Sequence, residues 1–504
     1  MSATLRGIDG QRVVVEVHVA NGLPAFHVVG LPDASCREAR DRVRAAIISS
    51  GFAWPRARIT VNLAPTGVRK EGAGLDLAIA LCVLAAATDE LGAAALDGIG
   101  CIGELGLDGS LRPVPGAVSL VSAIDTASII VPAAVAHEAE LGATGHVRGA
   151  DSLGQVVASL AGLAPWPEMA AAPDRVALRP QLDLCDVAGH SLARKALEVA
   201  AAGGHNLLLI GPPGAGKSML AKRIPGLLPD LDSETALTAT KVHSVAGLAL
   251  PAEFLMSVPP FRSPHHSASM SALIGGGSGR FRPGEVSCAH GGVLFLDELG
   301  EFAPRSLDAM RQPIEDGVVR ISRAHGSVTF PADFQLVAAM NPCPCGLLGS
   351  VEMCRCTDAA RQRYMRRLSG PLLDRIDVRV HMNRPAAAEL LAAEPGESTS
   401  TVRARVHQAR AFAVERGYTC NARMAPSDLA AFAPLSGPAV PLLRSALADG
   451  RLSARGLTRV RMVARTLADL AGDELIDESA VAGALALRAR PVLFDALGVP
   501  GVAI

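Results

Sequence analysis

NLLLIGPPGAGKSMLAKRI, from Asn206 to Ile224, is the stretch that decides the fold of this chain. Its first apolar run, LLLI, is typical of a strand buried inside a parallel sheet. GPPGAGKS follows directly, matches the pattern G-x-x-x-x-G-K-[ST], and leads into MLAKRI, which begins a helix. A strand, this loop and a helix in this order form a phosphate-binding loop. The stretch therefore predicts an α/β fold with a nucleotide site at one end of a parallel strand.

The residues of this loop have expected roles toward a bound nucleotide. The glycines let the backbone approach phosphate closely, so that its N–H groups and the helix N-terminus donate to the anion. Lys217 can reach the terminal phosphates, and the Ser218 hydroxyl can bind Mg²⁺. ATP and Mg²⁺ are the expected cofactors. The expected nucleotide-binding residues are Gly211, Pro212, Pro213, Gly214, Ala215, Gly216, Lys217, Ser218 and Asp297.

Two further apolar runs end in polar residues that suit the same site. HGGVLFLDELGEF predicts a buried strand, Val293–Leu296, followed by Asp297 and Glu298. Asp297 can hold the Mg²⁺, and Glu298 can polarise the attacking water. FQLVAAMN predicts a third strand that ends at Asn341, whose amide could orient that water. Without the phosphate-binding loop, the two acids would be interpreted as capping residues after a core strand.

A cysteine cluster follows the third strand at once. MNPCPCGLLGSVEMCRC, from Met340 to Cys356, holds two Cys-x-Cys pairs. In a reducing compartment four thiolates suit a tetrahedral structural zinc, although this spacing is tighter than the usual one. The alternatives are free thiols in a loop or a redox disulfide. The predicted Zn²⁺ ligands are Cys343, Cys345, Cys354 and Cys356, which would form a structural staple and not a catalytic metal site.

Length and composition restrict the class of protein. The chain has 504 residues, of which 49% are hydrophobic and 19% charged, and this indicates a globular protein of two to four domains. Its net charge is -1, so any nucleic-acid partner must be held by local basic patches. The most apolar stretch, Leu75–Ala87, is shorter than a membrane span and contains Asp76. With no recognisable secretory signal, we expect a cytoplasmic protein that contacts no membrane.

The order of elements predicts three regions. Residues 1–163 alternate strands and helices, and the Ala- and Pro-rich stretch 164–180 is typical of a linker. Residues 181–384 hold the nucleotide motifs and the cysteine cluster. Residues 385–504 are mostly helical.

Four motifs carry a specific resemblance. GPPGAGKS, VLFLDE, AAMNPCPCG and SGPLLDRIDVRV, in this order, resemble the AAA+ ATPase core of proteins related to magnesium-chelatase subunit I. The ComM/YifB family is the nearer match, and the resemblance covers nearly the whole chain. It implies an N-terminal α/β domain similar to the Lon proteolytic domain, a C-terminal helical lid, and a homo-hexameric ring with ATP sites between subunits.

The same resemblance suggests roles for two arginines. Arg375, to which the basic helix RQRYMRRLSGPLLDR leads, looks like the arginine finger that acts on the neighbouring subunit's nucleotide. Arg455 looks like the sensor-2 arginine of the lid, with Arg459 and Arg461 as alternatives. The simpler interpretations are a surface salt bridge for Arg375 and a solvated basic helix face for Arg455, Arg459 and Arg465.

The N-terminal region resembles Lon in fold and departs from it in chemistry. Lon-type proteolysis needs a serine activated by a desolvated lysine. Our alignment places Gly72 where the serine would be and Val118 where the lysine would be. We therefore expect a domain that does not hydrolyse peptides.

Two insertions are candidates for DNA contacts. Phe261–Ser287 carries His265 and His266, and Gly317–Phe334 is typical of a β-hairpin with Arg320, Arg323 and His325 near its turn. Charge alone would favour an ordinary exposed turn. In the motors that this family resembles, however, the corresponding insertions line the pore, and phosphates would be natural partners for these side chains.

These features predict an ATPase that works as a ring motor on DNA, with helicase-like branch migration in recombination or transformation. One alternative is a chelatase-like AAA+ remodeller of a protein partner. Another is a Lon-like module that binds or cleaves protein. The missing Ser–Lys pair weakens the proteolytic version, and the intact phosphate-binding loop weakens a purely binding role.

Overall fold

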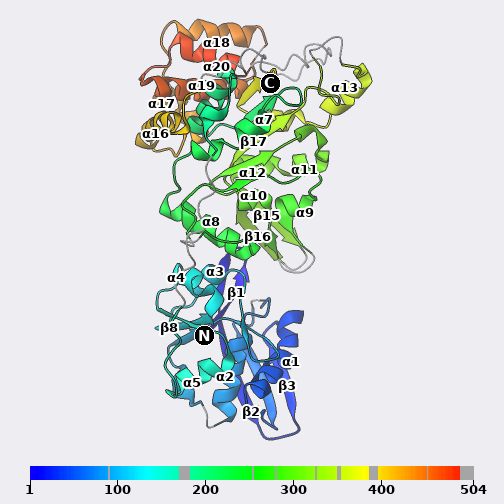
Figure 1. Cartoon of the computed structure of the whole chain (residues 1–504), viewed down its shortest axis with the longest axis vertical. Coiled ribbons are helices and arrows are strands. Elements are labelled where there is room, and N and C mark those ends of the chain that lie inside the picture. Colours follow the sequence, from blue (N-terminus) through cyan, green and yellow to red (C-terminus); the bar gives the residue numbers. More distant parts are fainter. Residues whose placement is uncertain are drawn as a thin grey trace.

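A five-stranded parallel sheet carries the motifs of the central region in this computed structural model (Figure 1). Its strands lie in the order β11-β14-β17-β10-β18, and every neighbouring pair is parallel. The strands are β10 Leu207–Ile210, β11 Phe261–Arg262, β14 Val293–Leu296, β17 Gln335–Met340 and β18 Val378–His381. The predicted strands at 207–210 and 293–296 are confirmed, and Asn341 directly follows the third strand.

The structure describes residues 1–67, 69–88, 91–169, 182–251, 255–277, 281–323, 326–348, 354–384, 396–450 and 452–488. We call 1–169 the N-terminal region, 182–384 the central region and 396–488 the C-terminal region. His325 and most of the predicted linker 164–180 lie outside the described residues.

Side chains that point alternately to the two faces of the buried strands divide the central region into two cores. Leu207 and Leu209 of β10 pack on one face of the sheet, whereas Leu208 and Ile210 pack on the other, because successive side chains of a strand point in opposite directions. The first face is covered by α6 (Ser191–Gly203) and by the C-terminal helices. The second face is covered by residues of 273–310 and 364–376 and by the hairpin of the central region.

The other elements of the central region surround this sheet. The helices are α7 Lys217–Ala221, α8 Ser233–Ala246, α9 Met270–Ile274, α10 Glu285–Cys288, α11 Pro304–Ala309, α12 Arg311–Asp316, α13 Asp358–Met365 and α14 Gly370–Leu373. Two short antiparallel pairs are β12 Gly275–Gly276 with β13 Arg282–Pro283, and β15 Val318–Arg323 with β16 Gly326–Pro331. The second pair is the predicted hairpin.

The predicted basic helix before Arg375 is divided in two. α13 ends at Met365, and α14 begins only at Gly370. Pro371 stands in the first turn of α14, where its missing N–H costs nothing, whereas inside a continuous helix it would remove the hydrogen bond to the Arg367 carbonyl and clash with it. The prediction of one continuous helix was therefore wrong.

The C-terminal region is helical throughout its described residues. It consists of α16 Thr399–Glu415, α17 Leu429–Phe432, α18 Ala439–Ala448, α19 Ala454–Ala471 and α20 Glu478–Ala486, with two short 3-10 turns. A buried hydrogen bond of 2.8 Å between His205 and Thr466 joins it to the central region. No helix among the described residues of the whole chain is long and apolar enough to cross a membrane.

Two larger sheets and one short antiparallel pair, β6 with β7, form the N-terminal region, which lies at one end of the elongated molecule (Figure 1). One has the order β1-β2-β4-β3 and the other, fully parallel, has the order β5-β8-β9. The strands are β1 Ser2–Arg6, β2 Asp9–Ala20, β3 Ala25–Val29, β4 Arg58–Ala64, β5 Ile99–Cys101, β6 Glu104–Leu105, β7 Leu111–Arg112, β8 Ser128–Pro132 and β9 His146–Ala150. The helices are α1 Ala34–Ser49, α2 Asp76–Ala87, α3 Ala117–Ser122, α4 Ala136–Glu140 and α5 Leu153–Leu160.

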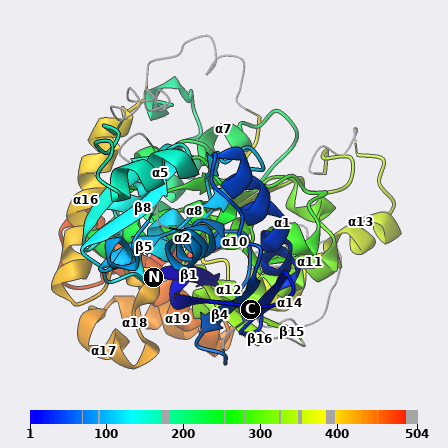
Figure 2. The ribbon, with the colours of Figure 1, turned by 90° about the horizontal axis from the view of Figure 1, so that it is seen from below.

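The N-terminal and central regions meet at a polar seam. α3 packs against α8, the Gly116 N–H donates to the Ser244 carbonyl at 3.1 Å, and the Ser244 hydroxyl donates to Glu138. Nearby, the β1–β2 turn touches the hairpin, where a Cβ on Gly7 would lie 2.7 Å from Val328. Figure 2, seen from the N-terminal end, shows the C-terminal helices α16 to α18 to one side of this contact.

The apolar stretch at Leu75–Ala87 is a core helix of the N-terminal region. Its Asp76 is 1% exposed and accepts two hydrogen bonds from Arg42, at 2.7 and 3.1 Å. Burial raises the pKa of the Asp76 carboxyl to about 6, and the Arg42 guanidinium opposes this shift. The helix can therefore hold an acid in the core only because α1 supplies the matching cation.

We expect Arg42→Ala to destabilise the N-terminal region by about 3 kcal/mol, because it leaves a buried carboxylate without its partner. Both tryptophans of the chain, Trp54 and Trp166, lie in this region, so urea unfolding followed by their fluorescence measures it. Arg40→Ala is the matched control, since Arg40 pairs with Asp41 in solvent on the same helix. Equal unfolding midpoints for the two variants would contradict this account of Asp76.

Candidate nucleotide site and cysteine cluster

A cavity of about 310 Å³ opens at the carboxyl ends of β10, β14 and β17. Ligand sites of parallel α/β sheets form at this edge. Gly214 and Gly216 both have φ +79, a left-handed conformation that favours glycine and turns the loop into the start of α7. The residues that line the cavity are Pro213, Gly214, Ala215, Gly216, Lys217, Ser218, Met219, Asp297, Glu298, Met340 and Asn341.

The ends of three strands are joined by side-chain hydrogen bonds. Lys217 Nζ donates to Asn341 Oδ1 at 3.1 Å and to the carbonyls of Gly211 and Pro212 at 2.7 and 2.9 Å. Ser218 Oγ donates to Asp297 Oδ2 at 2.6 Å. Burial lowers the pKa of Lys217, while the charges of Asp297 and Glu298 oppose this. A hydroxyl beside a carboxylate offers the oxygen ligands that Mg²⁺ prefers, and the lysine offers a cation for phosphate.

Glu298 is held in a strained conformation at the mouth of the cavity. Its φ of +51 is left-handed, which is uncommon for a residue other than glycine and often marks a functional site. His266 Nδ1 lies 3.0 Å from its carboxylate, and the rings of His265 and His266 have centroids 4.1 Å apart. The structure thus places His266 against Glu298, a residue that lines the cavity, and His265 against His266. The sequence feature that could have predicted this placement is the position of both histidines just after β11, which is the parallel neighbour of β14.

The candidate arginine finger is held within its own chain. Arg375 donates to the Glu315 carboxylate and, at 2.6 Å, to the Pro371 carbonyl, and its side chain is only 11% exposed. This contact corresponds to the simpler interpretation, a salt bridge. Arg375 does not line the nucleotide cavity of its own chain, which agrees with a residue whose target would be on a neighbour.

The three sensor-2 candidates differ in their contacts. Arg459 lies 3.3 Å from the buried Asp377, and Arg461 donates to two carbonyls of the segment around α17. Arg455 is exposed and makes no hydrogen bond or ion pair with any described residue. Arg465 is 2% exposed and pairs with Asp469, so α19 does not present a continuous solvated basic face. The structure does not bring Arg455 into the cavity.

The two hairpin arginines point to opposite faces. The strand register pairs Arg320 with Thr329 on the exposed face. Arg323 instead lies over the Phe281 ring, 4.9 Å from its centroid. The predicted DNA-binding residues are therefore divided among three places, because an odd number of positions along a strand reverses the side-chain direction and because the histidines belong to the nucleotide site.

The four clustered cysteines come together as predicted. Their sulfur atoms all lie within 4.8 Å of one another, and three of the separations are 3.4, 3.6 and 3.7 Å. Four thiolates around one zinc stand about 3.8 Å apart, whereas a disulfide needs about 2.05 Å. The geometry fits a tetrahedral metal site and excludes a disulfide in this conformation. Burial raises the pKa of Cys343 to about 12, and the Leu347 N–H lowers that of Cys345 to about 6.

The segment that holds the cysteines packs against the phosphate-binding loop. A Cβ on Gly346, between the two cysteine pairs, would lie 2.5 Å from Pro213 and 3.7 Å from the Asn341 amide carbon. Arg361 of α13 donates to Cys354 Sγ at 3.5 Å. Gly346 and Cys354 thus lie between the phosphate-binding loop and α13. Neither contact was predicted from the sequence.

Comparisons with known proteins agree with this architecture. Residues 183–390 match the family model "Magnesium chelatase, subunit ChlI", residues 396–488 match its C-terminal part, and residues 15–135 match "Subunit ChlI of Mg-chelatase". The chain is 44% identical to the protein YifB of Escherichia coli over 489 residues, 96% of this chain and 95% of that one. It is 41% identical to the competence protein ComM of Haemophilus influenzae over 498 residues, 97% of each. The chain belongs to the ComM/YifB family.

This ComM/YifB chain also has a shorter match to Lon protease 2 of Bacillus subtilis, 30% identical over 179 residues, or 32% of each chain. At the positions where a Ser–Lys pair was sought, Gly72 has φ +87 and Val118 is fully buried in α3. Neither supplies a nucleophile or a base. AAA+ membership suggests ATPase activity with ATP and Mg²⁺, which the residues of the cavity suit.

We expect this ComM/YifB protein, purified without chelator, to carry about one zinc per chain, since four thiolates complete one tetrahedral site. Changing Cys343 and Cys354 together to serine should abolish the zinc and lower the melting temperature. Elemental analysis and a thermal melt measure the two effects. Cys185→Ser, outside the cluster, should change neither. Full zinc content in the double variant would remove the metal assignment.

Proposed function

We propose that this chain is an ATP-hydrolysing AAA+ ring motor that acts on DNA, as a branch-migration helicase in recombination or transformation. The observation that carries the proposal is the convergence of Lys217, Ser218, Asp297, Glu298 and Asn341 on one cavity. The similarity to a competence protein supports DNA as the substrate.

Each residue of the cavity would have its own role in ATP hydrolysis. The loop N–H groups and Lys217 would hold the phosphates, and Ser218 and Asp297 would hold Mg²⁺, which supplies charge that offsets the phosphate oxygens. Glu298 would take the proton of the attacking water, and Asn341 would orient that water. Because His266 lies 3.0 Å from Glu298, this carboxylate has to exchange one partner for another when it acts.

A homo-hexamer would complete each site with Arg375 of the adjacent subunit. In a ring, Arg375 has to leave Glu315 in order to reach a neighbour's phosphate. Arg455 is the sensor-2 candidate that this proposal favours, because Arg459 and Arg461 are occupied in contacts within the chain. The cysteine cluster, with zinc bound, would keep the phosphate-binding loop and the approach to Arg375 in a fixed relation.

The match to a magnesium-chelatase subunit supports a second candidate, a remodeller of a protein partner. The two candidates share the ATPase and differ in what stimulates it.

Arg375→Ala should leave nucleotide binding nearly intact and lower turnover by about 10³, because an arginine finger stabilises charge that develops in the transition state. Lys217→Ala should weaken binding as well. Mixing Arg375→Ala with Glu298→Ala chains should restore some activity, since some interfaces then pair an intact finger with an intact acid. Steady-state phosphate release measures all three, and no recovery at any mixing ratio would contradict sites shared between subunits.

Forked or four-way DNA should stimulate ATP hydrolysis by the wild-type protein. Arg320→Ala should reduce both the stimulation and the movement of a branched junction, because it removes an exposed cation from the hairpin. Arg444→Ala, an equally exposed change on α18, is the control. A wild-type protein that ignores branched DNA in every nucleotide state would shift the choice to the protein remodeller.

A further inference from the structure

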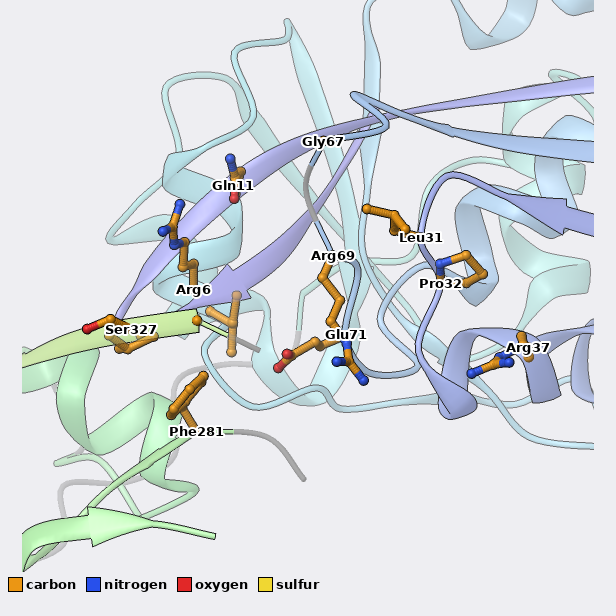
Figure 3. Close-up of a pocket in the computed structure, with 14 residues that line it drawn as sticks. Arg6, Gln11, Leu31, Pro32, Arg37, Gly67, Arg69, Glu71, Phe281 and Ser327 are labelled. Carbon is orange, nitrogen blue, oxygen red and sulfur yellow. The ribbon is translucent and has the colours of Figure 1, made fainter. Parts of the chain in front are cut away.

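A second and larger cavity, of about 560 Å³, lies where the N-terminal region meets the β15–β16 hairpin (Figure 3). One wall comes from the end of β1, from the segment before α1 and from the segment between β4 and α2. The other wall is formed by Phe281 and by Gly326, Ser327 and Val328 of the hairpin. A cavity of this size suits a ligand of a few tens of atoms.

Its N-terminal wall is basic. Arg6, Arg37 and Arg69 come from three separate segments, and Glu71 is the one acid among the described lining residues. The side chains of Arg6 and Arg69 are exposed and make no hydrogen bond or ion pair with any described residue, whereas the side chain of Arg37 donates to the Asp33 carbonyl at 3.3 Å. By contrast, Arg42, which packs inside the N-terminal region, is paired with Asp76. Unpaired guanidinium groups that share a cavity are instead suited to an anion, and phosphate matches their geometry.

The same cavity has an apolar side. Leu31, which is 57% exposed, lines it with Pro32 and with Phe281, which packs against the core of the central region and has the Arg323 guanidinium over its ring. Leu31 also has a left-handed φ of +57, uncommon for a branched residue. A ligand that suits the site must therefore present phosphate and an unpaired flat apolar group together, and this combination is typical of single-stranded nucleic acid.

We infer that this cavity binds one or two nucleotides of an unpaired DNA strand, with Arg6 and Arg69 on the phosphodiester oxygens and the bases against Leu31, Pro32 and Phe281. The inference rests on the proposed DNA motor and extends it, because it makes the N-terminal region part of the DNA path. Bases of intact duplex DNA are stacked inside the helix, so they could not reach this apolar wall.

The hairpin makes the cavity dependent on both regions. Ser327 and Val328 line it on one side, and the close approach of Gly7 to Val328 keeps the β1 end with its Arg6 beside the hairpin. A strand that follows the exposed face of the hairpin would therefore meet the arginines of the N-terminal region next.

The test compares Arg6→Ala/Arg69→Ala with Arg56→Ala/Arg58→Ala in the full-length protein. The control pair is equally exposed and lies at the start of β4, whereas the cavity lies beyond the end of that strand. Binding of fluorescein-labelled oligothymidine should weaken about tenfold in the first variant only, and the slope of log affinity against log salt should fall by about 1.4, at about 0.7 for each single-strand phosphate contact. Arg6→Lys/Arg69→Lys, which keeps both charges, should retain most of the affinity and the slope.

Several outcomes would overturn the inference. Unchanged oligothymidine affinity in Arg6→Ala/Arg69→Ala, while Arg320→Ala weakens it, would remove this cavity and leave the DNA motor standing. Wild-type protein that binds no oligothymidine would remove both. A fluorescent ATP analogue that binds Lys217→Ala protein, and is lost when Arg6 and Arg69 are also changed, would make the cavity a site for free nucleotide. If Arg6→Lys/Arg69→Lys lost as much affinity as Arg6→Ala/Arg69→Ala and kept the wild-type melting temperature, the two arginines would not be recognising phosphate charge.

Discussion

The hydrogen bonds that join Lys217 to Asn341 and Ser218 to Asp297 depend on the order of strands in one parallel sheet. These partners are 124 and 79 positions apart in the chain, and they meet because β10, β17 and β14 are consecutive neighbours whose carboxyl ends share an edge. An order that moved β14 or β17 away from β10 would separate Asp297 or Asn341 from Lys217 and Ser218. The burial of LLLI on both faces of the sheet therefore decides where the chemistry can take place.

The same edge explains why a cysteine cluster lies where it does. A lysine that is desolvated and bonded to the carbonyls of its own loop needs that loop to keep its shape. Gly346 packs on Pro213 at the outer side of the loop, and the cysteine pairs lie on either side of Gly346. A metal bound by four thiolates would remove the freedom of this segment without placing a charge among the phosphates. The cluster thus suits a structural role, and none of its four cysteines lines the nucleotide cavity.

Features that depend on local pattern could be predicted from the sequence, and features that depend on tertiary placement could not. The strands at 207–210 and 293–296, the hairpin and the grouping of the four cysteines follow from apolar runs and spacing. The contact of His266 with Glu298 depends on which strands are neighbours, and that of Arg375 with Glu315 depends on how α12 and α14 pack. Arg320 and Arg323 are three positions apart on β15, so their side chains point to opposite faces. Arg323 therefore lies over Phe281, and Arg320 stays exposed.

The N-terminal region has no serine–lysine pair at the two positions considered, so its position relative to the central region is what can matter. In the N-terminal region, Gly72 and Val118 offer no peptide chemistry, yet the seam to the central region is specific: Ser244 donates to a Glu138 carboxylate whose pKa is raised by burial, and Gly116 bonds to the same serine. A buried acid is costly unless it is hydrogen-bonded, so a seam of this kind favours one fixed orientation over a sliding contact. That orientation holds the β1–β2 turn against the hairpin. The fixed orientation of the N-terminal region therefore decides which of its residues lie beside the hairpin of the central region.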